Sequence, residues 1–474
     1  MSSPDPPLVR PLAIHDPLDA ASTLAALPHP FVLHSALEDR RGRWSFFGAD
    51  PFATHRGGDP RVAIERFRAL AARSRERSHE PAAPFRGGAV GYWAYDYGRR
   101  LERLPQSAAD DLALPDFVMS FYDVIAAYDH DAQRAWLFSS GLPLRGRGRE
   151  RRARERLEGF ARRIEAGAPK LPATIDRPLG VHGTFTPERY RAAVETVREH
   201  IRHGDLYQAN LTQRWSVRLP PAVPGPRAWT LTRALARLSP APFNAFLDLG
   251  DHAIASASPE RFLQLRDGHV ESRPIKGTRP RGASAAEDHR LADELRASVK
   301  DRAENVMIVD VLRNDLGRVC RAGSIEVPEL CTLESFAQVH HLVSAVTGEL
   351  AAGLDAFDLL HATFPGGSIT GAPKIRAMEI LEGLEPVRRH LYTGAIGWLD
   401  WCGDADWSIA IRTALVTAGA IHVAAGGGIT ADSQPEAEYQ ETLDKVEGVR
   451  QAIEAAFGPI TFGAAAPDAS LAAR

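Results

Sequence analysis

The chain has 474 residues, of which 44% are hydrophobic and 25% are charged, and its formal net charge is -3. This composition is typical of a soluble globular protein, and so small a net charge provides no field for nucleic acid or an anionic membrane. The three cysteines are scattered without a C-x-x-C spacing, which argues against a disulfide framework or a cysteine zinc site and fits a reducing cytoplasm. There is no apolar run of about 18 residues and no signal-peptide core, so we expect a cytoplasmic protein that binds neither nucleic acid nor membrane.

The N-terminal region, residues 1–178, is predicted to consist mainly of short strands. Segments with the composition of strands lie at residues 33–35, 43–48, 117–128 and 135–138. The segment 85–96 is rich in glycine and aromatic residues, which is typical of a buried strand with a close backbone approach.

Proline and glycine between residues 166 and 178 mark the expected boundary between this region and a second one. The second region is predicted to span residues 179–458. Residues 459–474 consist largely of small residues and are expected to form a disordered tail.

An arginine-rich segment lies just before this boundary. Nine arginines fall between residues 145 and 163, which could indicate a nucleic-acid site. However, glutamates are interleaved with them, and Leu157, Phe160 and Ile164 fall on one helical face. No aromatic residues alternate with the arginines to stack bases, so a solvated helix is favoured.

The second region is predicted to open with a helix that is capped by Thr186 and begins at Pro187. Its buried stripe consists of Tyr190, Val194, Val197 and Ile201. A long helix is expected to run from about residue 286 to residue 316.

Two predicted helices each carry a pair of carboxylates on one face, Asp301 with Glu304 and Glu438 with Glu441. Paired acidic residues on a helix are usually solvated surface charge. A Mg²⁺ site is the alternative, because Mg²⁺ prefers a few carboxylates together with water and an anionic substrate oxygen.

The second of these helices is expected to start at a capping box formed by Ser433 and Glu436. Lys445 adds a cation on the same stripe, one turn after Glu441. Before this helix, a strand at 421–425 is expected to end in the glycines 426–428, whose backbone N–H groups could approach an anion closely. A loop without a ligand is the other interpretation of these glycines.

Lys276 lies between Ile275 and Gly277 after a strand-like run, and a lysine at such a turn is usually a solvated charge. The other interpretation comes from the motifs that accompany it. They are Ser-Pro-Glu-Arg-Phe at 258–262, Asp-Arg-Ala-Glu-Asn at 301–305, His-His at 340–341, Gly-Gly-Ser-Ile-Thr-Gly-Ala-Pro-Lys at 366–374, Gly-Gly-Gly at 426–428 and Glu-Ala-Glu-Tyr-Gln-Glu at 436–441.

This ordered set resembles the chorismate-utilising enzymes. The lysine in Pro-Ile-Lys-Gly-Thr is similar to the aminodeoxychorismate synthase branch of that family, whereas anthranilate synthases typically carry Ala there. The resemblance is strong over residues 180–457 and weaker over residues 1–180. It implies an α+β, anthranilate-synthase-like fold with two large antiparallel β-sheets packed face to face, helices outside, and two regions that intertwine.

The resemblance implies Mg²⁺ as the cofactor. Its direct ligands would be Glu304 and Glu441, with Asp301 and Glu438 near the ion. The family often carries Glu in place of Asp301, so the shorter side chain makes this position the least secure of the four.

Catalytic roles are implied for Lys276 as the nucleophile, Glu260 as the general acid and His341 as a further site histidine. His340 lies next to His341, and a core histidine is the alternative interpretation of His341. Contacts with the substrate, which is a dicarboxylate, are implied for Gly277, Thr278, Ser368, Tyr392, Arg412, Gly426, Gly427, Gly428 and Lys445.

In the implied mechanism, Lys276 adds to C2 of chorismate while the C4 hydroxyl leaves with a proton from Glu260. Ammonia then attacks C4 and expels the lysine, giving 4-amino-4-deoxychorismate, the precursor of 4-aminobenzoate in folate biosynthesis. We expect a separate glutaminase (amidotransferase) subunit to supply the ammonia, because none of the three cysteines lies in a Gly-x-Cys-x-Gly nucleophile turn.

The resemblance also implies a tryptophan pocket. Its residues would be Ser35, Ser45, Phe46, Pro242, Phe243 and Asn244. Ordinary sheet packing is an equally open interpretation of these short segments.

Three alternatives remain. Anthranilate synthase component I has the same fold and a different product. Isochorismate and salicylate synthases also carry a lysine in the site, but the segments at 207–211 and 259–262 resemble the aminodeoxychorismate branch more closely. A non-catalytic regulatory homologue would be expected to lack the carboxylates or Glu260, and the sequence retains all of them.

Overall fold

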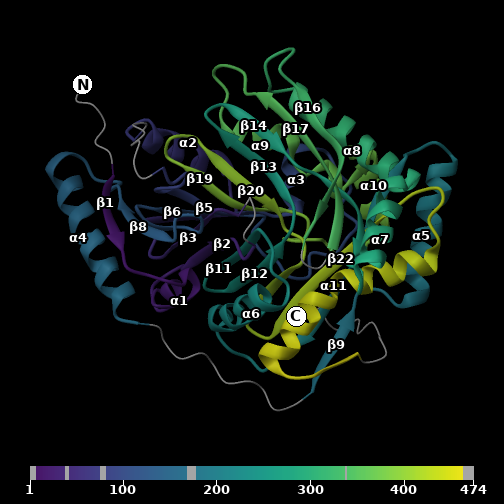
Figure 1. The fold of residues 1–474 in the computed structure, drawn as a ribbon, viewed down its shortest axis with the longest axis horizontal. Helices are drawn as coiled ribbons and strands as arrows, with labels where there is room; N and C mark the ends of the chain where they lie inside the picture. Colours follow the sequence, from purple (N-terminus) through teal and green to yellow (C-terminus); the bar gives the residue numbers. More distant parts are fainter. Residues whose placement is uncertain (1–6, 38–41, 75–81, 168–177, 337–338, 463–474) are drawn as a thin grey trace.

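The computed structural model describes residues 7–37, 42–74, 82–167, 178–336 and 339–462 (Figure 1). Most of the boundary expected at residues 166–178 therefore lies outside the described residues. The same holds for residues 463–474 of the expected tail.

Two large β-sheets form the frame of the molecule. Within the described residues, the first sheet has thirteen strands and the second has ten. In spatial order the first contains β1 (Leu8–Leu12), β8 (Arg134–Ser139), β7 (Val124–Asp129), β3 (Trp44–Gly48), β2 (Phe31–His34), β11 (Phe243–Asp248), β12 (His252–Ser258), β21 (Thr413–Thr417), β22 (Ala420–Ile429), β10 (Gln208–Arg218), β9 (Leu179–Gly183) and β23 (Ile460–Phe462), with β18 (Gly371–Ala372) paired to β10. The second contains β15 (Ile275–Pro280), β17 (Val339–Glu349), β14 (His269–Ser272), β13 (Arg261–Arg266), β20 (Ala405–Ile409), β19 (Ala395–Asp400), β5 (Gly88–Trp93), β6 (Phe117–Tyr122) and β4 (Ala53–Arg56), with β16 (Glu326–Ser335) paired to β17.

Helices lie on the outer faces of the two sheets (Figure 1). They are α1 (Pro17–Ser22), α2 (Pro60–Ala71), α3 (Gly98–Leu101), α4 (Gly146–Glu165), α5 (Pro187–Arg202), α6 (Pro224–Leu238), α7 (Ala285–Ala297), α8 (Val299–Gly317), α9 (Ala356–Thr363), α10 (Lys374–Leu384) and α11 (Pro435–Phe457), with the short 3₁₀ helices η1 (Tyr95–Tyr97) and η2 (Gly367–Ile369).

Buried residues of both sheets meet in one apolar cluster, which includes Phe46 of β3, Ile254 of β12 and Ile396 of β19. A second cluster packs α6 and α11 against the first sheet, and a third packs α2, α8 and α9 against the second sheet. The predicted α+β fold, with two antiparallel sheets face to face and helices outside, is confirmed.

The two sequence regions share both sheets. In the first sheet β2 pairs with β11, and in the second β5 pairs with β19. In Figure 1, strands from the early part of the chain accordingly lie beside strands from its second half. The chain boundary near residue 178 is thus no division between separately packed units.

The start of the expected tail is ordered. Residues 460–462 form β23, which pairs in parallel with β9. The expectation of a disordered tail rested on the small residues that dominate the whole segment, whereas the β-branched residues Ile460 and Thr461 favour a strand at its start.

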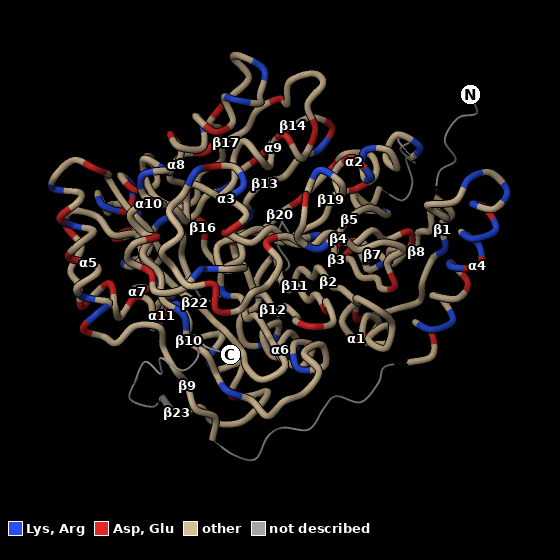
Figure 2. The backbone as a smooth tube through the Cα atoms, turned by 180° about the vertical axis from the view of Figure 1, so that it is seen from behind, with Lys and Arg blue, Asp and Glu red and all other residues tan. Residues whose placement is uncertain are grey.

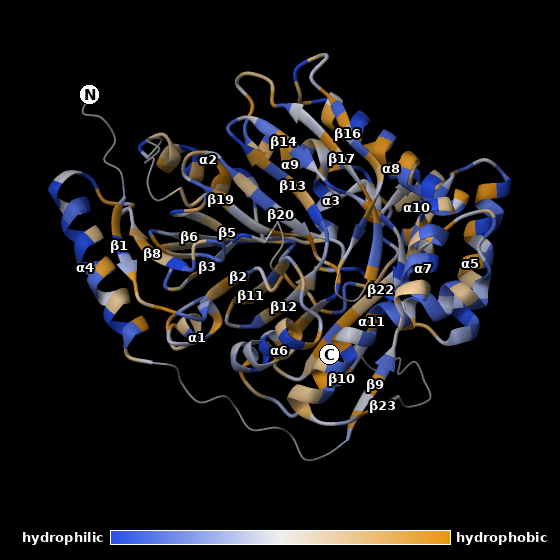
Figure 3. Cartoon of the chain, viewed as in Figure 1, coloured by the Kyte–Doolittle hydropathy of each residue, from blue (hydrophilic) through white to orange (hydrophobic). Residues whose placement is uncertain are grey.

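The arginine-rich segment forms α4, and Leu157, Phe160 and Ile164 are buried on one face as predicted. Figure 3 shows α4 mostly hydrophilic with a few hydrophobic positions, and Figure 2 shows basic and acidic residues interspersed along it. Some arginines fasten the helix inward, since Arg152 and Arg156 both bind the buried Asp123. These contacts favour a packing role for this face over a nucleic-acid surface.

Thr186 caps α5, as predicted, by accepting a hydrogen bond from Arg189 N–H. The prediction of one long helix at 286–316 is wrong, because the helix is interrupted at Ser298 and divides into α7 and α8. Ser298 has extended backbone angles, and its hydroxyl accepts a hydrogen bond from Asp301 N–H at 3.2 Å. A serine that bonds the backbone in this way competes with helix continuation.

None of the helices in the described ranges is both long and apolar enough to cross a bilayer.

Replacing Ser298 with alanine should lower the free energy of unfolding by about 1 kcal/mol, because the α8 N-cap is lost. Ser298→Asp retains an acceptor and should remain close to the wild type. The stability of each variant is measured as the midpoint of urea unfolding, which is followed by circular dichroism. Equal midpoints for Ser298→Ala and the wild type would show that the cap contributes nothing.

Candidate active site

A cavity of about 650 Å³ lies where β15, α8, η2, β22 and α11 meet. Many of the predicted site residues line it together. They are Glu260, Lys276, Gly277, Thr278, Asp301, Glu304, His341, Ser368, Tyr392, Arg412, Gly426, Gly428, Glu441 and Lys445. Gly427 and Glu438 are not among the lining residues.

The Lys276 amine lies inside this cavity and donates a hydrogen bond to the Ser368 carbonyl oxygen at 2.8 Å. Removal from water lowers the pKa of Lys276, while the carboxylates of Glu304 and Glu260 oppose this shift. The interpretation of Lys276 as a solvated loop charge is therefore wrong. Its ammonium form is less favoured here than in water, so a neutral and nucleophilic amine is more accessible.

Glu260 is buried, and it accepts a hydrogen bond from the Ser368 hydroxyl at 2.6 Å. Burial raises the pKa of Glu260, while the Ser368 hydroxyl and the positive charge of Lys276 act in the opposite direction. Ser368 thus contacts the lysine through its backbone and the carboxyl group through its side chain.

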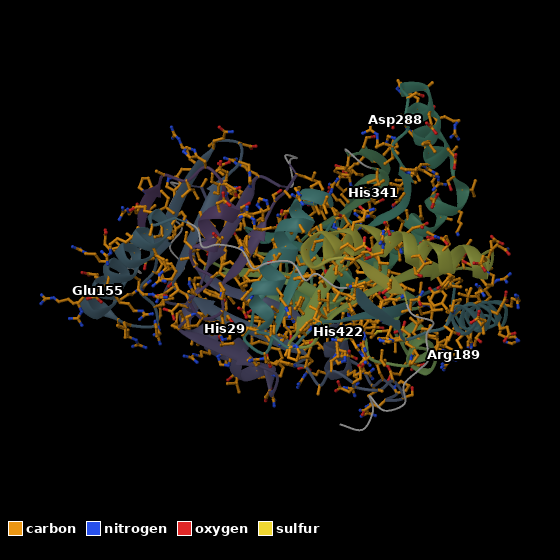
Figure 4. All side chains as sticks on the ribbon, turned by 90° about the horizontal axis from the view of Figure 1, so that it is seen from below. His29, Glu155, Arg189, Asp288, His341 and His422 are labelled. Atoms are coloured by element: carbon orange, nitrogen blue, oxygen red, sulfur yellow. The ribbon has the colours of Figure 1, made fainter. Side chains whose placement is uncertain are left out.

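His341 and not His340 faces the cavity, because consecutive residues of β17 point to opposite faces of the sheet. The ring of His341, labelled in Figure 4, is 2.9 Å from the Thr278 hydroxyl. His340 instead lies 3.0 Å from Asp288 and 2.7 Å from Ser335.

The break at Ser298 places Asp301 in the first turn of α8 and Glu304 one turn later, both at the cavity. Asp301 accepts a hydrogen bond from Arg279 at 3.2 Å. Glu304 has no side-chain hydrogen bond or ion pair within the described residues. Its pKa is raised, first by burial and also by the neighbouring carboxylates of Asp301 and Glu441, while Lys276 opposes the shift.

The capping box expected at Ser433 and Glu436 is wrong. The N-cap of α11 is Gln434, and the Ser433 hydroxyl donates to Glu438 at 2.6 Å. Pro435 at the first helical position moves the start of the helix past Ser433. This bond holds Glu438 behind the cavity wall, whereas Glu441 reaches the cavity and pairs with Lys445 at 2.6 Å.

These carboxylates fit a divalent cation held mainly by Glu304 and Glu441. No group of three or more His, Cys, Asp or Glu side chains in the described part of the chain could hold a metal by itself. Mg²⁺ does not need such a group, since it commonly binds one or two carboxylates and completes its shell with water and substrate. The unpartnered, partly buried Glu304 is the donor that a cation would stabilise most.

The glycines 426–428 do not end the strand as expected but continue within β22, where they pair with residues 210–212 of β10. Side chains would not fit here. A Cβ at Gly426 would lie 2.4 Å from the Leu211 carbonyl oxygen, and one at Gly428 would lie 2.0 Å from Gln208 Nε2. Gly426 therefore allows close pairing with β10, and Gly428 leaves room for the Gln208 side chain.

Arg412 lines the cavity and has no side-chain hydrogen bond or ion pair within the described residues. Burial lowers its pKa, but a guanidinium remains charged at any physiological pH. Its backbone is in the left-handed region, with φ 48°. A half-buried, unpartnered guanidinium on a strained backbone is suited to binding a carboxylate of a ligand.

Sequence reasoning missed several lining residues, including Asn210, Arg279 and Lys300. Asn210 belongs to the segment 207–211 that favoured the aminodeoxychorismate branch, so a signal for it was present. Arg279 and Lys300 lie on exposed-looking charged segments, where spacing gives no indication of a cavity.

A second cavity, of about 750 Å³, lies between the sheets. Four of the six residues predicted for a tryptophan pocket line it, namely Phe46, Pro242, Phe243 and Asn244. Ser35 and Ser45 do not line it. The Ser45 hydroxyl lies instead within hydrogen-bond distance of the His34 and His130 rings. Tryptophan binding in this cavity stays a prediction.

Residues 32–451 match the protein family described as "chorismate binding enzyme". The chain belongs to this family. The chain is 41% identical over 451 residues to aminodeoxychorismate synthase component 1 of Klebsiella aerogenes, covering 91% of this chain and 95% of the relative.

Anthranilate synthase component 1 of Mycobacterium bovis is 38% identical over 475 residues, covering 93% of this chain and 90% of the relative. Among solved structures, anthranilate synthase component I from Streptococcus pneumoniae superposes with a TM-score of 0.74 at 32% identity, covering 87% of this chain and 94% of that one. The fold is thus common to relatives with two different names.

Replacing Ser368 with alanine should raise the pKa of Glu260 further. The hydroxyl donates to the carboxylate and so stabilises its charged form, and losing that bond favours the protonated form. Ser368→Thr keeps a hydroxyl and serves as the matched control. Carbon NMR titration of labelled glutamate, with the signal assigned by Glu260→Gln, measures the shift. An unchanged or lower pKa in Ser368→Ala would contradict this coupling.

Proposed function

We propose that this chain aminates chorismate at C4 with ammonia to give 4-amino-4-deoxychorismate, through a covalent adduct on Lys276. The observation that carries the proposal is the position of the Lys276 amine. It lies within the substrate-sized cavity, its pKa is lowered by burial, and Ser368 links it to the buried Glu260. The similarity to relatives named aminodeoxychorismate synthase component 1 supports the choice of product.

The first step forms the bond between Lys276 Nζ and C2 of chorismate. The C1=C2 and C5=C6 double bonds shift to C1=C6 and C4=C5, and the C4 hydroxyl departs as water with the proton of Glu260. The raised pKa of Glu260 supports its role as the acid, because a larger fraction stays protonated. The lowered pKa of Lys276 supports its role as the nucleophile.

The second step replaces the lysine. Ammonia bonds to C4, the two double bonds return to C1=C2 and C5=C6, and the C2–Nζ bond breaks with its electron pair on Lys276. The Lys276 amine is then regenerated and one proton from the incoming nitrogen is released to a base. The Glu260 carboxylate, left charged by the first step, would accept it.

The two carboxylates of chorismate need positive partners. Arg412, which has no acidic partner in the described ranges, suits one of them as a bidentate donor. Glu304 and Glu441 would hold Mg²⁺, which supplies a positive charge for the other carboxylate when bound.

A separate glutaminase would supply the ammonia. Burial raises the pKa of Cys320 to about 11, which disfavours the thiolate, and Cys331 is also buried. The product would serve as a precursor of 4-aminobenzoate in folate biosynthesis. A cytoplasmic location stays a prediction.

Lys276→Ala should reduce formation of the 4-amino product about a hundredfold or more, the scale typical for loss of one catalytic group. Lys276→Arg keeps a positive charge but cannot become neutral, so it should lose the same activity. Purified protein with chorismate, Mg²⁺ and ammonium is assayed, and 4-aminobenzoate is read out after a lyase is added.

Two results would contradict the proposal. Anthranilate as the main wild-type product would favour the alternative function of anthranilate synthase. This alternative is the relevant one because relatives named anthranilate synthase component 1 are 38% identical to this chain. Full formation of the 4-amino product by Lys276→Ala would show that the lysine is not the nucleophile.

Glu304→Gln and Glu441→Gln should each lose most Mg²⁺-dependent activity while keeping the circular dichroism of the wild type. Glu436→Gln is the matched control on α11, because Glu436 is exposed and paired with Arg191. Direct Mg²⁺ binding by calorimetry should weaken in the two site variants and not in the control. Wild-type rates in excess EDTA would exclude the metal.

A further inference from the structure

The contacts of Ser368 with Lys276 and Glu260 depend on η2, a helix of a single turn. The two backbone hydrogen bonds that close this turn are each 3.4 Å long, which is longer than usual for N–H···O bonds. A short 3₁₀ turn of this kind has little stability of its own. Contacts from outside η2 must therefore hold Ser368 where it meets the lysine and the glutamate.

Arg389 supplies such a contact without lining the substrate cavity. Its side chain is 2% exposed, and its Nη1 donates a hydrogen bond to the Ile369 carbonyl oxygen at 3.0 Å. Ile369 directly follows Ser368 and itself lines the cavity. The Arg389 guanidinium thus holds the peptide unit next to the one that accepts a hydrogen bond from Lys276.

The same guanidinium also holds a strand of the cavity wall. Its Nη2 donates to the carbonyl oxygen of Asn210, a cavity-lining residue of β10, at 2.6 Å. The Asn210 N–H donates in turn to the Thr370 carbonyl oxygen at 2.8 Å. Arg389 therefore fastens η2 and β10 to one another.

The orientation of the guanidinium is itself fixed. Glu385 accepts from Nε at 2.8 Å and from Nη2 at 2.7 Å, and Nη1 also lies 3.4 Å from the Thr393 hydroxyl. The guanidinium carbon lies 4.4 Å from the centre of the Tyr95 ring. Each of the five N–H groups of Arg389 thus has an acceptor, and only the planar fork of an arginine presents donors in all these directions.

We propose that Arg389 is a positioning residue, which orients Ser368 toward Lys276 and Glu260 by holding the Ile369 and Asn210 carbonyl groups. The inference rests on the proposed amination and adds a residue to it. Arg389 touches neither the substrate nor the reacting groups. It acts by fixing the backbone that carries them.

Replacing Arg389 with lysine separates this positioning from charge. The lysine keeps a cation for Glu385, so no buried carboxylate is left without a partner. Its single nitrogen cannot serve Glu385 and both backbone carbonyls at once. A second variant, Arg389→Met combined with Glu385→Gln, removes both charges together and keeps an acceptor for the Thr212 N–H, which Glu385 binds at 3.0 Å.

The matched control is Arg99→Lys. Arg99 is 14% exposed and pairs with Asp96 at 2.9 Å and with Glu382. None of these three residues lines the substrate cavity. The control therefore makes the same chemical change at a half-buried ion pair that has no link to η2.

The first readout is the pKa of Glu260, measured by carbon NMR of labelled glutamate without substrate. Because the Ser368 hydroxyl stabilises the charged form, a displaced Ser368 should raise this pKa toward its value in Ser368→Ala. We expect the rise in both Arg389 variants and the wild-type value in Arg99→Lys. An arginine with a merely structural role would lower the midpoint of urea unfolding and leave the Glu260 pKa unchanged.

A double variant tests whether Arg389 acts through Ser368. In Ser368→Ala the hydroxyl is already absent, so adding Arg389→Lys should not change the Glu260 pKa further. A further rise as large as that in the wild-type background would show that Arg389 does not act through Ser368, and it would overturn the inference.

The second readout is the division of the kinetic effect between kcat and KM. In Arg389→Lys, kcat for amination should fall about tenfold or more, while KM for chorismate stays within about twofold of the wild type. Arg99→Lys should keep both wild-type values.

A wild-type Glu260 pKa in both Arg389 variants would overturn the inference. An equal change in Arg99→Lys would also overturn it, because general destabilisation would then be the cause. A wild-type enzyme that does not aminate chorismate would instead refute the proposed function. The Glu260 pKa does not depend on that activity, so the two failures are distinguishable.

Discussion

The removal of the Lys276 amine from water is the physical constraint on which this site depends. Burial alone favours the neutral amine, and each surrounding carboxylate favours the ammonium. The site balances these effects by burying Glu260 as well, which raises its pKa and reduces its negative charge. Cation binding at Glu304 and Glu441 would shift the balance further toward the neutral amine. A nucleophilic lysine and a protonated acid can therefore exist in one cavity.

The fold brings these groups together from distant parts of the chain. Glu260 follows β12 of the first sheet, Lys276 lies on β15 of the second, and Ser368 lies in η2 between them. Helices α8 and α11 add Glu304 and Glu441 from the outside. Because the cavity is formed where both sheets meet these helices, the packing of the whole molecule fixes the distances within the site.

Local signals in the sequence were sufficient for part of this arrangement. The Thr186–Pro187 start of α5 and the buried face of α4 were predicted correctly from local patterns, whereas the face-to-face sheets were predicted from the family resemblance. The wrong predictions concern places where a single residue or a neighbouring strand overrides the pattern of the surrounding segment. Ser298 ends one helix and caps the next, Pro435 shifts the start of α11 beyond Ser433, and Gly426 to Gly428 remain in a strand because β10 pairs closely with them. The positions of Arg279 and Lys300 at the substrate cavity depend on tertiary packing, and no sequence pattern indicates them.

The most direct test of the account is to observe the lysine adduct itself. Wild-type protein is mixed with chorismate and Mg²⁺ in the absence of ammonium, quenched in acid, digested and examined by mass spectrometry. The account predicts a peptide containing Lys276 that has gained the mass of chorismate minus one water, and that loses this mass when ammonium is added before the quench. An unmodified Lys276 peptide, in protein that forms the 4-amino product at its normal rate once ammonium is supplied, would contradict it.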